Sequence, residues 1–501
     1  MKFRRIISAV MAACIALPTA MAGAVSALEE PVLGDVNADT YFNLSDIVMY
    51  QRWLSGKGEL VDTSGADVNG DGELDIFDLS TMRKMLIEGI NSVPVPSYAP
   101  NSRNLCAGIN NSGIEGKKAD KKFIESQMKF TVDLLKATTE EGKNSMISPY
   151  SVMQALAMTA NGANGKTLEE MEQVLGNGMS IEELDRYLLT QRLNSVNKEK
   201  SKYNNWSMNT ANSIWAIDDK SRIQARPEFI QKCVDYYNSD YYIAPFDQTT
   251  LDDVNGWVNE KTNKMIPKIL NKISEYDVMY LVNAVAFEAQ WAEQYESYQI
   301  KDSKFNAANG EKQDAKMLCS DELYLCDENT TGMLKSYSGG KYAFAALLPE
   351  EGTSVEKYVA DLTPEKLTNI LNSYKGIYER ADVELPKFKC EYGADISDQL
   401  VAMGMPTAFD KNPDLKADFT NLSAIADIHP ISIGYVIHKT FIDLDENGTK
   451  AAAATLVAMQ DNGAFFPMDK KEVILDRPFV YCIIDTETSI PVFIGVLNSL
   501  S

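Results

Sequence analysis

Residues 446–455 read Glu-Asn-Gly-Thr-Lys-Ala-Ala-Ala-Ala-Thr, and this stretch decides the fold. In an extended strand, alternate side chains point to opposite faces. Counted in twos from Thr449, one face carries only small or apolar side chains and no charge: Thr449, Ala451, Ala453, Thr455, Val457 and Met459. The charge of Lys450 falls on the other face, where it avoids a burial cost of roughly several kcal/mol. The stretch therefore has one face that a sheet could bury.

A helical turn is the alternative interpretation of the same stretch. Alanine is the best helix former, and glycines stand on either side of the run at Gly448 and Gly463. Thr449 could cap such a helix. Taken alone, the residues fit either a strand that can be inserted into a sheet or a short helix.

The surrounding region, residues 120–501, mixes helical and strand-like patterns without strict alternation, which predicts an α+β fold. Apolar residues recur at helical spacing around 123–135, and the segments 152–158 and 168–175 also have helical patterns. Five runs have strand-like patterns: 280–287, 342–348, 383–388, 436–444 and 479–484. Some of them are almost wholly apolar, as expected for strands covered on both faces.

Towards the N-terminus, residues 33–91 contain a duplicated acidic motif, with Asp67 standing 32 residues after Asp35. Each copy places side-chain oxygens at loop positions 1, 3, 5, 9 and 12, the spacing with which EF-hand loops hold calcium. The predicted ligands are Asp35, Asn37, Asp39, Asn43, Asp46, Asp67, Asn69, Asp71, Asp75 and Asp78. Helix-like runs follow at 47–54 and 79–86. Duplication in register argues against solvated turns and predicts a small all-α module with two Ca²⁺ sites.

The two predicted loops differ at position 6, where the chain turns sharply. The second loop has Gly72 there, whereas the first has Thr40. Both loops end in Asp rather than the usual Glu at position 12. We therefore expect the first loop to be strained or to bind calcium more weakly.

The first 27 residues predict a signal peptide, because a basic start precedes the apolar run 6–17, which is too short to span a membrane. Cleavage is expected after Ala27, with residues 20–22 as a second candidate. The net charge of −23 argues against nucleic acid and anionic membrane as partners. Residues 92–119 are rich in Pro, Ser, Asn and Gly and predict a linker. The cysteines after Cys14 form no CxxC pair and predict buried thiols.

Enzyme signatures are absent from the sequence. It contains two histidines, His429 and His438, and no GxSxG or HExxH motif. Ser148 or Ser151 could in principle meet His438, but neither stands in a nucleophile elbow. The sequence therefore predicts a protein that is not an enzyme.

With these loops and helices, residues 33–91 resemble a type I dockerin module. The resemblance implies a cohesin module on a scaffoldin, as in a cellulosome, as the partner. It also implies contact through loop positions 10 and 11 and through the helices that follow: Leu44, Ser45, Ile76, Phe77, Arg52, Arg83 and Lys84. Because the two halves differ at these positions, a symmetric two-way binding mode is not expected.

From about residue 120 to the end, the chain resembles the serpin family of serine protease inhibitors. The motifs that carry this resemblance occur in order as Asn-Ser-Met-Ile-Ser-Pro-Tyr-Ser at 144–151, Leu-Val-Asn-Ala at 281–284, Leu-Pro-Lys-Phe at 385–388, His-Lys-Thr-Phe at 438–441, Glu-Asn-Gly-Thr at 446–449, Asp-Arg-Pro-Phe at 476–479 and Phe-Ile-Gly at 493–495. The resemblance implies a large mixed sheet and an exposed reactive loop that inserts into the sheet after cleavage. It favours the strand interpretation of 446–455 over the helix, although the family prefers Glu where Lys450 stands.

The resemblance also implies roles for individual residues. The loop hinge would comprise Glu446, Gly448, Thr449, Ala451, Ala453 and Thr455. The reactive bond would be Asn462–Gly463, with Met459, Phe465 and Phe466 as alternatives. A cluster controlling sheet opening would comprise Ser148, Ser151, Asn283, His438, Trp291 and Lys387, with Lys387 paired to Glu446.

The sequence thus predicts a secreted, monomeric inhibitor of subtilisin-, elastase- or chymotrypsin-like proteases, tethered to an extracellular scaffold. Trypsin-like targets are not expected, because the candidate specificity residues include no Lys or Arg. Two alternatives stay open. One is a non-inhibitory serpin-fold module that binds a partner on the same scaffold, and the other is a purely structural module.

Overall fold

The structure is a computed structural model that describes residues 33–37, 42–63, 65–68, 73–91, 99–274, 277–375, 379–412, 414–449 and 471–500. The chain divides into two compact units, Met1–Val93 and Pro94–Ser501. The predicted signal peptide, 1–27, lies outside the described residues. In the part of the chain that is described, no helix is long and apolar enough to cross a membrane.

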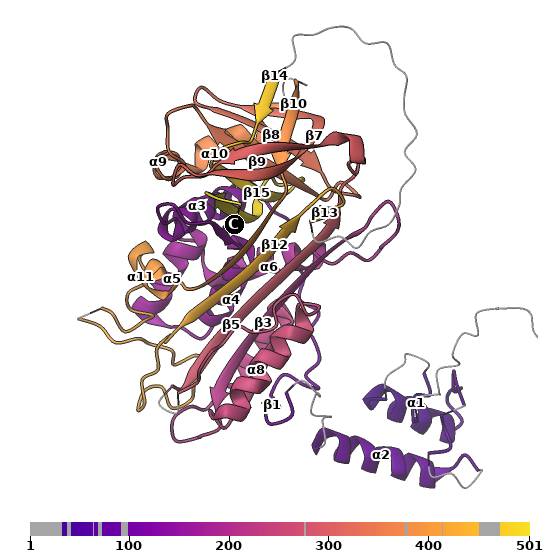
Figure 1. The fold of residues 1–501 in the computed structure, drawn as a ribbon. Coiled ribbons are helices and arrows are strands. Elements are labelled where there is room, and N and C mark those ends of the chain that lie inside the picture. The colour runs from indigo at the N-terminus through magenta and orange to yellow at the C-terminus, as the bar shows by residue number, and fades with distance from the viewer. Residues whose placement is uncertain are drawn as a thin grey trace, which may run out of the picture. The chain divides into compact units, whose positions relative to one another are not determined.

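The first unit is a pair of helices, α1 (Leu44–Leu54) and α2 (Ile76–Asn91), which lie side by side (Figure 1). An Asn43 cap and a capping box with Asp46 begin α1. The apolar faces of the helices meet in a small core with the preceding loops, formed by Val36, Ile47, Tyr50, Ala66, Leu79 and Met82. This arrangement confirms the predicted small all-α module.

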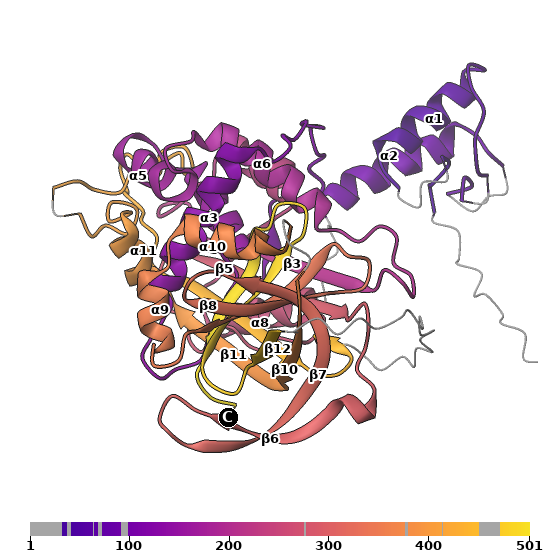
Figure 2. The same cartoon turned by 90° about the horizontal axis from the view of Figure 1, so that it is seen from above.

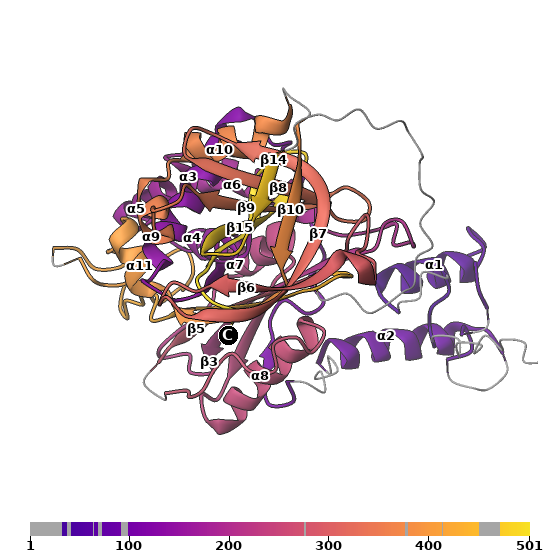
Figure 3. The same ribbon diagram turned by 45° about the horizontal axis from the view of Figure 1, so that its top comes forward.

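The second unit contains two sheets. The seven-stranded sheet has the order β1 (Arg103–Asn104), β4 (Asp240–Ala244), β3 (Trp206–Ile217), β5 (Met279–Gln290), β13 (Gly448–Thr449), β12 (Val436–Leu444) and β11 (Phe388–Asp395). The nine-stranded sheet has the order β14 (Lys471–Ile474), β10 (Arg380–Pro386), β7 (Lys312–Cys326), β8 (Thr330–Ser336), β9 (Tyr342–Pro349), β15 (Phe479–Asp485), β16 (Pro491–Leu497) and β2 (Ser145–Ile147), and β6 (Ile300–Asn306) pairs with β7. Figure 3 shows β10 beside β14 and β9 beside β15, above β3 and β5 in this view.

Helices cover the sheets, and the fold is α+β as predicted. The helices of this unit are α3 (Lys121–Thr138), α4 (Pro149–Ala160), α5 (Gly165–Gly176), α6 (Ile181–Asn194), α7 (Pro227–Lys232), α8 (Gln248–Lys261), α9 (Val355–Asp361), α10 (Pro364–Asn372) and α11 (Ser397–Met403), with the short turns Cys233–Tyr237, Ser297–Gln299 and Ser373–Lys375. Figure 2 shows α3, α5 and α11 grouped together. The helix α4 is buried along its whole length against β3 and β5, as its apolar residues require.

The predicted strand at 383–388 is wrong as a single element. The structure ends β10 at Pro386 in the nine-stranded sheet and begins β11 at Phe388 in the seven-stranded sheet. Pro386 has no N–H group with which to continue a ladder. The N–H of Lys387, between the two strands, donates to the carbonyl of Lys316 at 2.9 Å.

The structure also differs from the predicted linker at 92–119. From Ala99 onward this segment packs on the second unit, where Ala99 and Ser102 are buried. The Asn101 and Ser102 side chains donate to Asp253 at 3.1 and 2.6 Å. The strand β1 pairs with β4 at the edge of the sheet. Small polar residues typical of linkers are here ordered by a buried carboxylate.

The prediction of buried thiols is confirmed for four of the six described cysteines. Those at 106, 233, 390 and 482 are buried, and Cys319 and Cys326 are half-buried in β7. All six are free thiols in the structure.

Candidate functional site: a seam in the main sheet

The strand β5 has two unlike edges. Its edge with β3 is a continuous antiparallel ladder from Ala289 opposite Trp206 to Met279 opposite Ala216. Its edge with β12 is parallel and runs only from Leu281 opposite Val436 to Ala284 opposite Lys439. We call this junction between β5 and β12 the seam.

The two-residue strand β13 lies in the upper end of the seam (Figure 1). It is antiparallel to both neighbours: Gly448 pairs with Gln290, and Thr449 pairs with Ala289 and Leu444. Gly448 has φ of +151°, and a Cβ at this position would lie 2.0 Å from the carbonyl oxygen of Ala289. Only glycine fits this close approach of two backbones.

Thr449 is buried, with 1% of its surface exposed. Its hydroxyl lies 2.5 Å from that of Tyr337, whose ring stacks on Trp291 with centroids 4.5 Å apart. The side chain therefore lies on the inner face, which is the face on which the count in twos places it.

Four of the predicted sheet-opening residues meet at the lower, paired part of the seam, and all four are buried. The His438 Nε2 atom accepts the Ser148 N–H at 3.0 Å, and its Nδ1 atom lies 3.1 Å from Asn283 Oδ1. Asn283 Nδ2 donates to Ser151 Oγ at 2.6 Å. These bonds link β5, β12 and the start of α4 across the seam.

Burial lowers the pKa of His438 to about 3, so the imidazole is neutral at physiological pH. The bonding partners assign the proton to Nδ1, which donates to Asn283, and leave Nε2 as the acceptor. The Ser148 hydroxyl donates instead to the carbonyl of Val492 at 2.8 Å. This geometry is not that of a nucleophile activated by a histidine, because the imidazole accepts an amide proton and not the hydroxyl proton.

The other two predicted residues of the cluster, Trp291 and Lys387, lie at the upper end of the seam. The Trp291 indole donates to the carbonyl of Asp445 at 2.9 Å, and its backbone N–H donates to the carbonyl of Asn447 at 2.9 Å. Lys387 forms an ion pair with Glu446. Burial opposes ionisation of Glu446, but the hydrogen bonds and the charge of Lys387 lower its pKa overall. These contacts hold the turn that leads into β13.

The remaining hinge and reactive-bond residues lie outside the described residues. They are Ala451, Ala453, Thr455, Met459, Asn462, Gly463, Phe465 and Phe466. The structure also shows two contact residues that the sequence did not indicate: Tyr337 at the upper end of the seam, and Asn212 in β3 on the other edge of β5. Asn212 accepts a hydrogen bond from Asn283 Nδ2 at 2.6 Å. No local pattern could have marked Tyr337, since 112 residues separate it from Thr449.

In the first unit, the acidic loops are closed by the carboxylates predicted for position 12. Asp46 Oδ1 accepts the N–H groups of Val36 and Asn37 at 3.0 and 3.3 Å, and its Oδ2 accepts that of Asn43 at 2.8 Å. Asp78 accepts the N–H groups of Val68 and Asp75, both at 2.9 Å. Both carboxylates are fully buried.

The predicted position-9 residues cap the helices that follow, since Asn43 accepts the N–H of Ser45 and Asp75 accepts that of Phe77. Asp35 is buried and Asn37 and Asp67 are half-buried, whereas Asp39, Asn69 and Asp71 lie outside the described residues. Among the residues that the structure describes, no three His, Cys, Asp or Glu side chains come together to hold a metal. The described donors are all oxygens on short closed loops, which fits a hard cation such as calcium.

The predicted cohesin-binding residues lie on the surface. Ile76 and Phe77 are 57% and 65% exposed, unusually high values for large apolar side chains. The side chains of four further predicted residues are exposed, namely Ser45, Arg52, Arg83 and Lys84. The side chain of Leu44 lies outside the described part of the structure. Val48 is a further exposed apolar residue that the sequence analysis missed. Its position three residues after Ser45 on the same helix could have indicated it.

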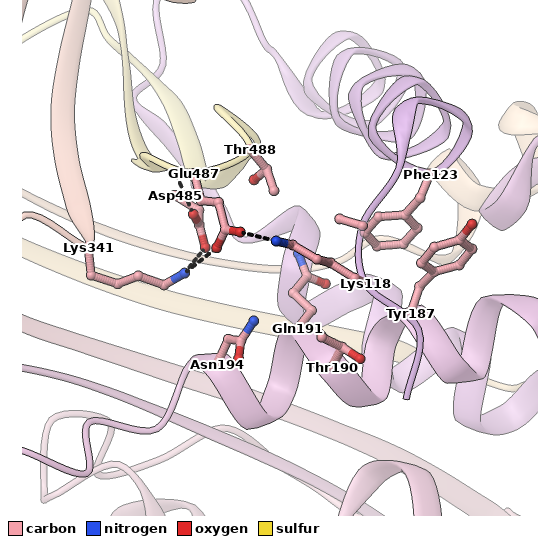
Figure 4. A pocket seen from close by; sticks show the side chains of 11 residues that line it. Lys118, Phe123, Tyr187, Thr190, Gln191, Asn194, Lys341, Asp485, Glu487 and Thr488 are labelled. Carbon is pink, nitrogen blue, oxygen red and sulfur yellow. Dashed lines mark hydrogen bonds and ion pairs between the residues drawn. The ribbon is translucent and has the colours of Figure 1, made fainter. Parts of the chain in front are cut away.

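A pocket between α6 and the C-terminal hairpin is shown in Figure 4. Ion pairs of Lys341 with Asp485 at 2.7 Å and of Lys118 with Glu487 at 3.6 Å lie across it. Its cavity volume is about 30 Å³, which is the space of one water molecule. The pocket is therefore too small for an organic ligand.

The second unit is thus an α+β protein whose main sheet holds the short strand β13 between β5 and β12, which are parallel to each other. The chain belongs to the serpin family, since the family model for serine protease inhibitors matches residues 125–500. The model for type I dockerin domains matches residues 33–87. Both matches confirm the families expected from the sequence.

Relatives cover most of the chain. An uncharacterised serpin-like protein of Thermococcus kodakarensis is 32% identical over 390 residues, covering 75% of this chain and 85% of the relative. The leukocyte elastase inhibitor of Bos taurus is 30% identical over 389 residues, covering 74% of this chain and 97% of the relative.

Two solved structures of the thermophilic serpin tengpin also resemble this chain. The native state is 42% identical with a TM-score of 0.73, covering 80% of this chain and 100% of tengpin. The latent state is 40% identical with a TM-score of 0.66, covering 77% of this chain and 100% of tengpin. The present structure is thus closer to the native than to the latent state.

Proposed function

We propose that this chain is a secreted inhibitor that traps serine proteases by inserting its cleaved loop into the seam between β5 and β12. The observation that carries the proposal is β13, which already pairs with both strands at the upper end of the seam. The segment that follows Thr449 keeps the small, uncharged face needed to continue downward.

The pairing geometry supplies a driving force for insertion. A strand continuing from β13 would run antiparallel to both β5 and β12. It would replace the short parallel pairing of those strands with two antiparallel ladders, which are slightly more stable per residue. The uncleaved form would then be held by a kinetic barrier rather than by being the most stable state.

In the proposed reaction, the serine of the target protease attacks the carbonyl carbon of the residue before the reactive bond. The peptide bond breaks, the new amine departs, and an acyl-enzyme forms. Loop insertion then carries the acylated protease along and distorts it before water can hydrolyse the ester. We assign the reactive bond to Asn462–Gly463, with Met459, Phe465 and Phe466 as alternatives.

We propose targets whose specificity pockets accept apolar or small residues, which are subtilisin-, elastase- and chymotrypsin-like proteases. The name of the bovine relative, leukocyte elastase inhibitor, supports an elastase-like target. A serpin-fold module that binds a partner without inhibiting a protease is the competing function.

The test is to mix the purified chain with subtilisin, an elastase and chymotrypsin, followed by a denaturing gel and mass spectrometry. Trapping predicts a band at the summed mass and a released peptide that begins at Gly463 or near it. Clipping without a covalent band would favour the non-inhibitory function. A thermal scan gives a second readout, because a loop that inserts after cleavage should raise the melting temperature by about 10 °C or more.

We further propose that the dockerin binds two Ca²⁺ ions and docks on a cohesin module of an extracellular scaffoldin. The exposed residues Ile76, Phe77, Arg83 and Lys84 support a contact centred on the second repeat. Native gels with a panel of cohesins, run with calcium and with EDTA, would test this. Detection of the mature chain outside the cell, beginning at Leu28, would test secretion and cleavage after Ala27.

A further inference from the structure

At one buried position the two repeats of the dockerin differ in hydrogen-bonding chemistry: the first has Tyr50 where the second has Met82. Tyr50, on α1 of the first repeat, is fully buried in the small core. Its hydroxyl donates to Asp78 Oδ2 of the second repeat at 3.2 Å, across 28 residues of sequence. A hydroxyl needs a hydrogen-bond partner when it is buried, and Asp78 provides one.

Asp78 closes the second acidic loop, and donors hold both of its oxygens. The Val68 N–H, from the second position of the loop, donates to Oδ1. The Asp75 N–H and the Tyr50 hydroxyl donate to Oδ2. Rotation of the carboxylate is therefore restrained from the loop on one side and from the neighbouring helix on the other.

Among the described residues, the first loop shows no equivalent arrangement. The residue that stands 32 positions after Tyr50 is Met82, which is also fully buried. Its thioether has no hydrogen to donate. In the described part of this loop, Asp46 accepts hydrogen bonds from the backbone amides of Val36, Asn37 and Asn43.

We propose that Tyr50 is a positioning residue for calcium in the second loop and makes that loop the tighter of the two. The inference rests on the proposed binding of calcium by both loops. A hydrogen-bond donor behind a metal ligand fixes the orientation of the ligand, and its loss typically weakens metal binding about 10- to 100-fold. Gly72 in the second loop, where the first has Thr40, favours the same ranking.

The experiment measures Ca²⁺ binding to the full chain by calorimetry in two matched backgrounds. Asp35→Asn replaces the first carboxylate of the first loop with a neutral amide and so weakens that loop, and Asp67→Asn does the same to the second loop. With the second loop intact, in Asp35→Asn, Tyr50→Phe should weaken calcium binding about tenfold. With only the first loop intact, in Asp67→Asn, the same change should alter the affinity less than about twofold.

Met82→Leu in both backgrounds is the packing control, and we expect less than about a twofold change. Stopped-flow release of Ca²⁺ to a fluorescent chelator from the otherwise unaltered chain needs neither loop variant. There, Tyr50→Phe should speed one of the two release phases about tenfold. Tyr50→Phe keeps the ring and its contact with Trp53, at 5.3 Å between centroids, so the small core retains its apolar packing.

Three results would overturn the inference. Equal weakening in both backgrounds would show that Tyr50 acts through packing, and no change in either would show that its hydroxyl does not act on the site. Greater weakening of the first loop would reverse the assignment. If the parent chain bound no Ca²⁺ at all, the proposed calcium sites themselves would fail, and that result is distinct from the other three.

Discussion

The strand β5 is hydrogen-bonded to a neighbouring strand on each edge, but the two ladders differ in direction and in length. Towards β3 the ladder is antiparallel and continuous along almost the whole strand. Towards β12 the ladder is parallel, short and supplemented by buried side-chain bonds among Asn283, His438 and Ser148. The comparison teaches that backbone pairing holds β5 along nearly its whole length on the β3 side and only along a short stretch on the β12 side.

The variant Thr449→Arg should have the largest effect on this difference. An arginine would place an unpaired charge beside Tyr337 in the upper seam, at a cost of roughly several kcal/mol. We expect the yield of covalent protease complex to fall at least about tenfold while loop cleavage continues. Lys450→Arg, at the neighbouring position of opposite parity, is the control. An undiminished complex yield in Thr449→Arg would refute insertion through the seam.

The lower seam can be compared directly with the β3 edge, because Asn283 and Asn212 are register partners. Asn283→Ala removes the bonds to Ser151 and His438 together with the bond to Asn212, and we expect a loss of about 2–3 kcal/mol in unfolding free energy. Asn212→Ala removes the bond to Asn283 alone and should cost about 1 kcal/mol. Urea midpoints measure both losses. Equal losses of unfolding free energy in the two variants would show that the bonds of Asn283 to Ser151 and His438 do not stabilise the protein further.

Acid should weaken the seam selectively. The native pKa of His438 is lowered by burial from 6.5 to about 3, so the unfolded chain takes up this proton before the native chain does. The stability that depends on neutral His438 is complete above pH 6.5 and is lost as the pH falls towards 3. About 2 kcal/mol should be lost by pH 5.

The measurement compares urea midpoints of the parent and His438→Gln between pH 7 and pH 5. A comparison is needed because burial raises the pKa of Asp185 to about 7, and that carboxyl stabilises the native state as the pH falls. The difference in unfolding free energy between the parent and His438→Gln should shrink by about 2 kcal/mol from pH 7 to pH 5. A constant gap, or an imidazole NMR signal of His438 that titrates between pH 7 and 5, would contradict the expectation.

The smallest effect is expected from Lys387→Met at the upper end of the seam. The Lys387–Glu446 pair is partly exposed, with side chains 28% and 33% accessible, so its loss should cost only about 0.5–1 kcal/mol. Lys389→Met breaks a similar pair with Asp443, away from the turn into β13, and serves as the control. The rate of spontaneous loop insertion should rise in Lys387→Met and not in Lys389→Met, because only the first variant loosens the turn that leads into β13. Identical rates in the two variants would show that the Lys387–Glu446 pair has no part in opening the seam.

The sequence predicted which segments form helices and strands better than it predicted which segments pack against one another. Strand-like runs such as 436–444 coincide with strands, and the spacing of the acidic loops predicts the two helices that follow them. The prediction at 383–388 was wrong because apolar residues stand on both sides of Lys387, at Leu385 and Phe388, although these two residues belong to strands of different sheets. Residues 99–119 looked like a linker because the buried Asp253 that orders them lies far away in the sequence.

The same limit applies to the site. Ser148, Asn283 and His438 could be singled out through family motifs, and the structure brings them together. The bond between Tyr337 and Thr449 could not be predicted, because it depends on which strands become neighbours. The different roles of Tyr50 and Met82 were also hidden, since both are simply apolar-face residues of a helix until their partners are known.

The attachment of β1 to the sheet has a mechanical consequence. β1 lies at one outer edge, and β4, β3 and β5 separate it from the seam. Any tension that reaches the serpin unit through the residues before Ala99 is first carried by the β1–β4 ladder and by the bonds to Asp253. A pulling force from the N-terminal side would therefore load this outer edge of the sheet before it reached the junction of β5 and β12.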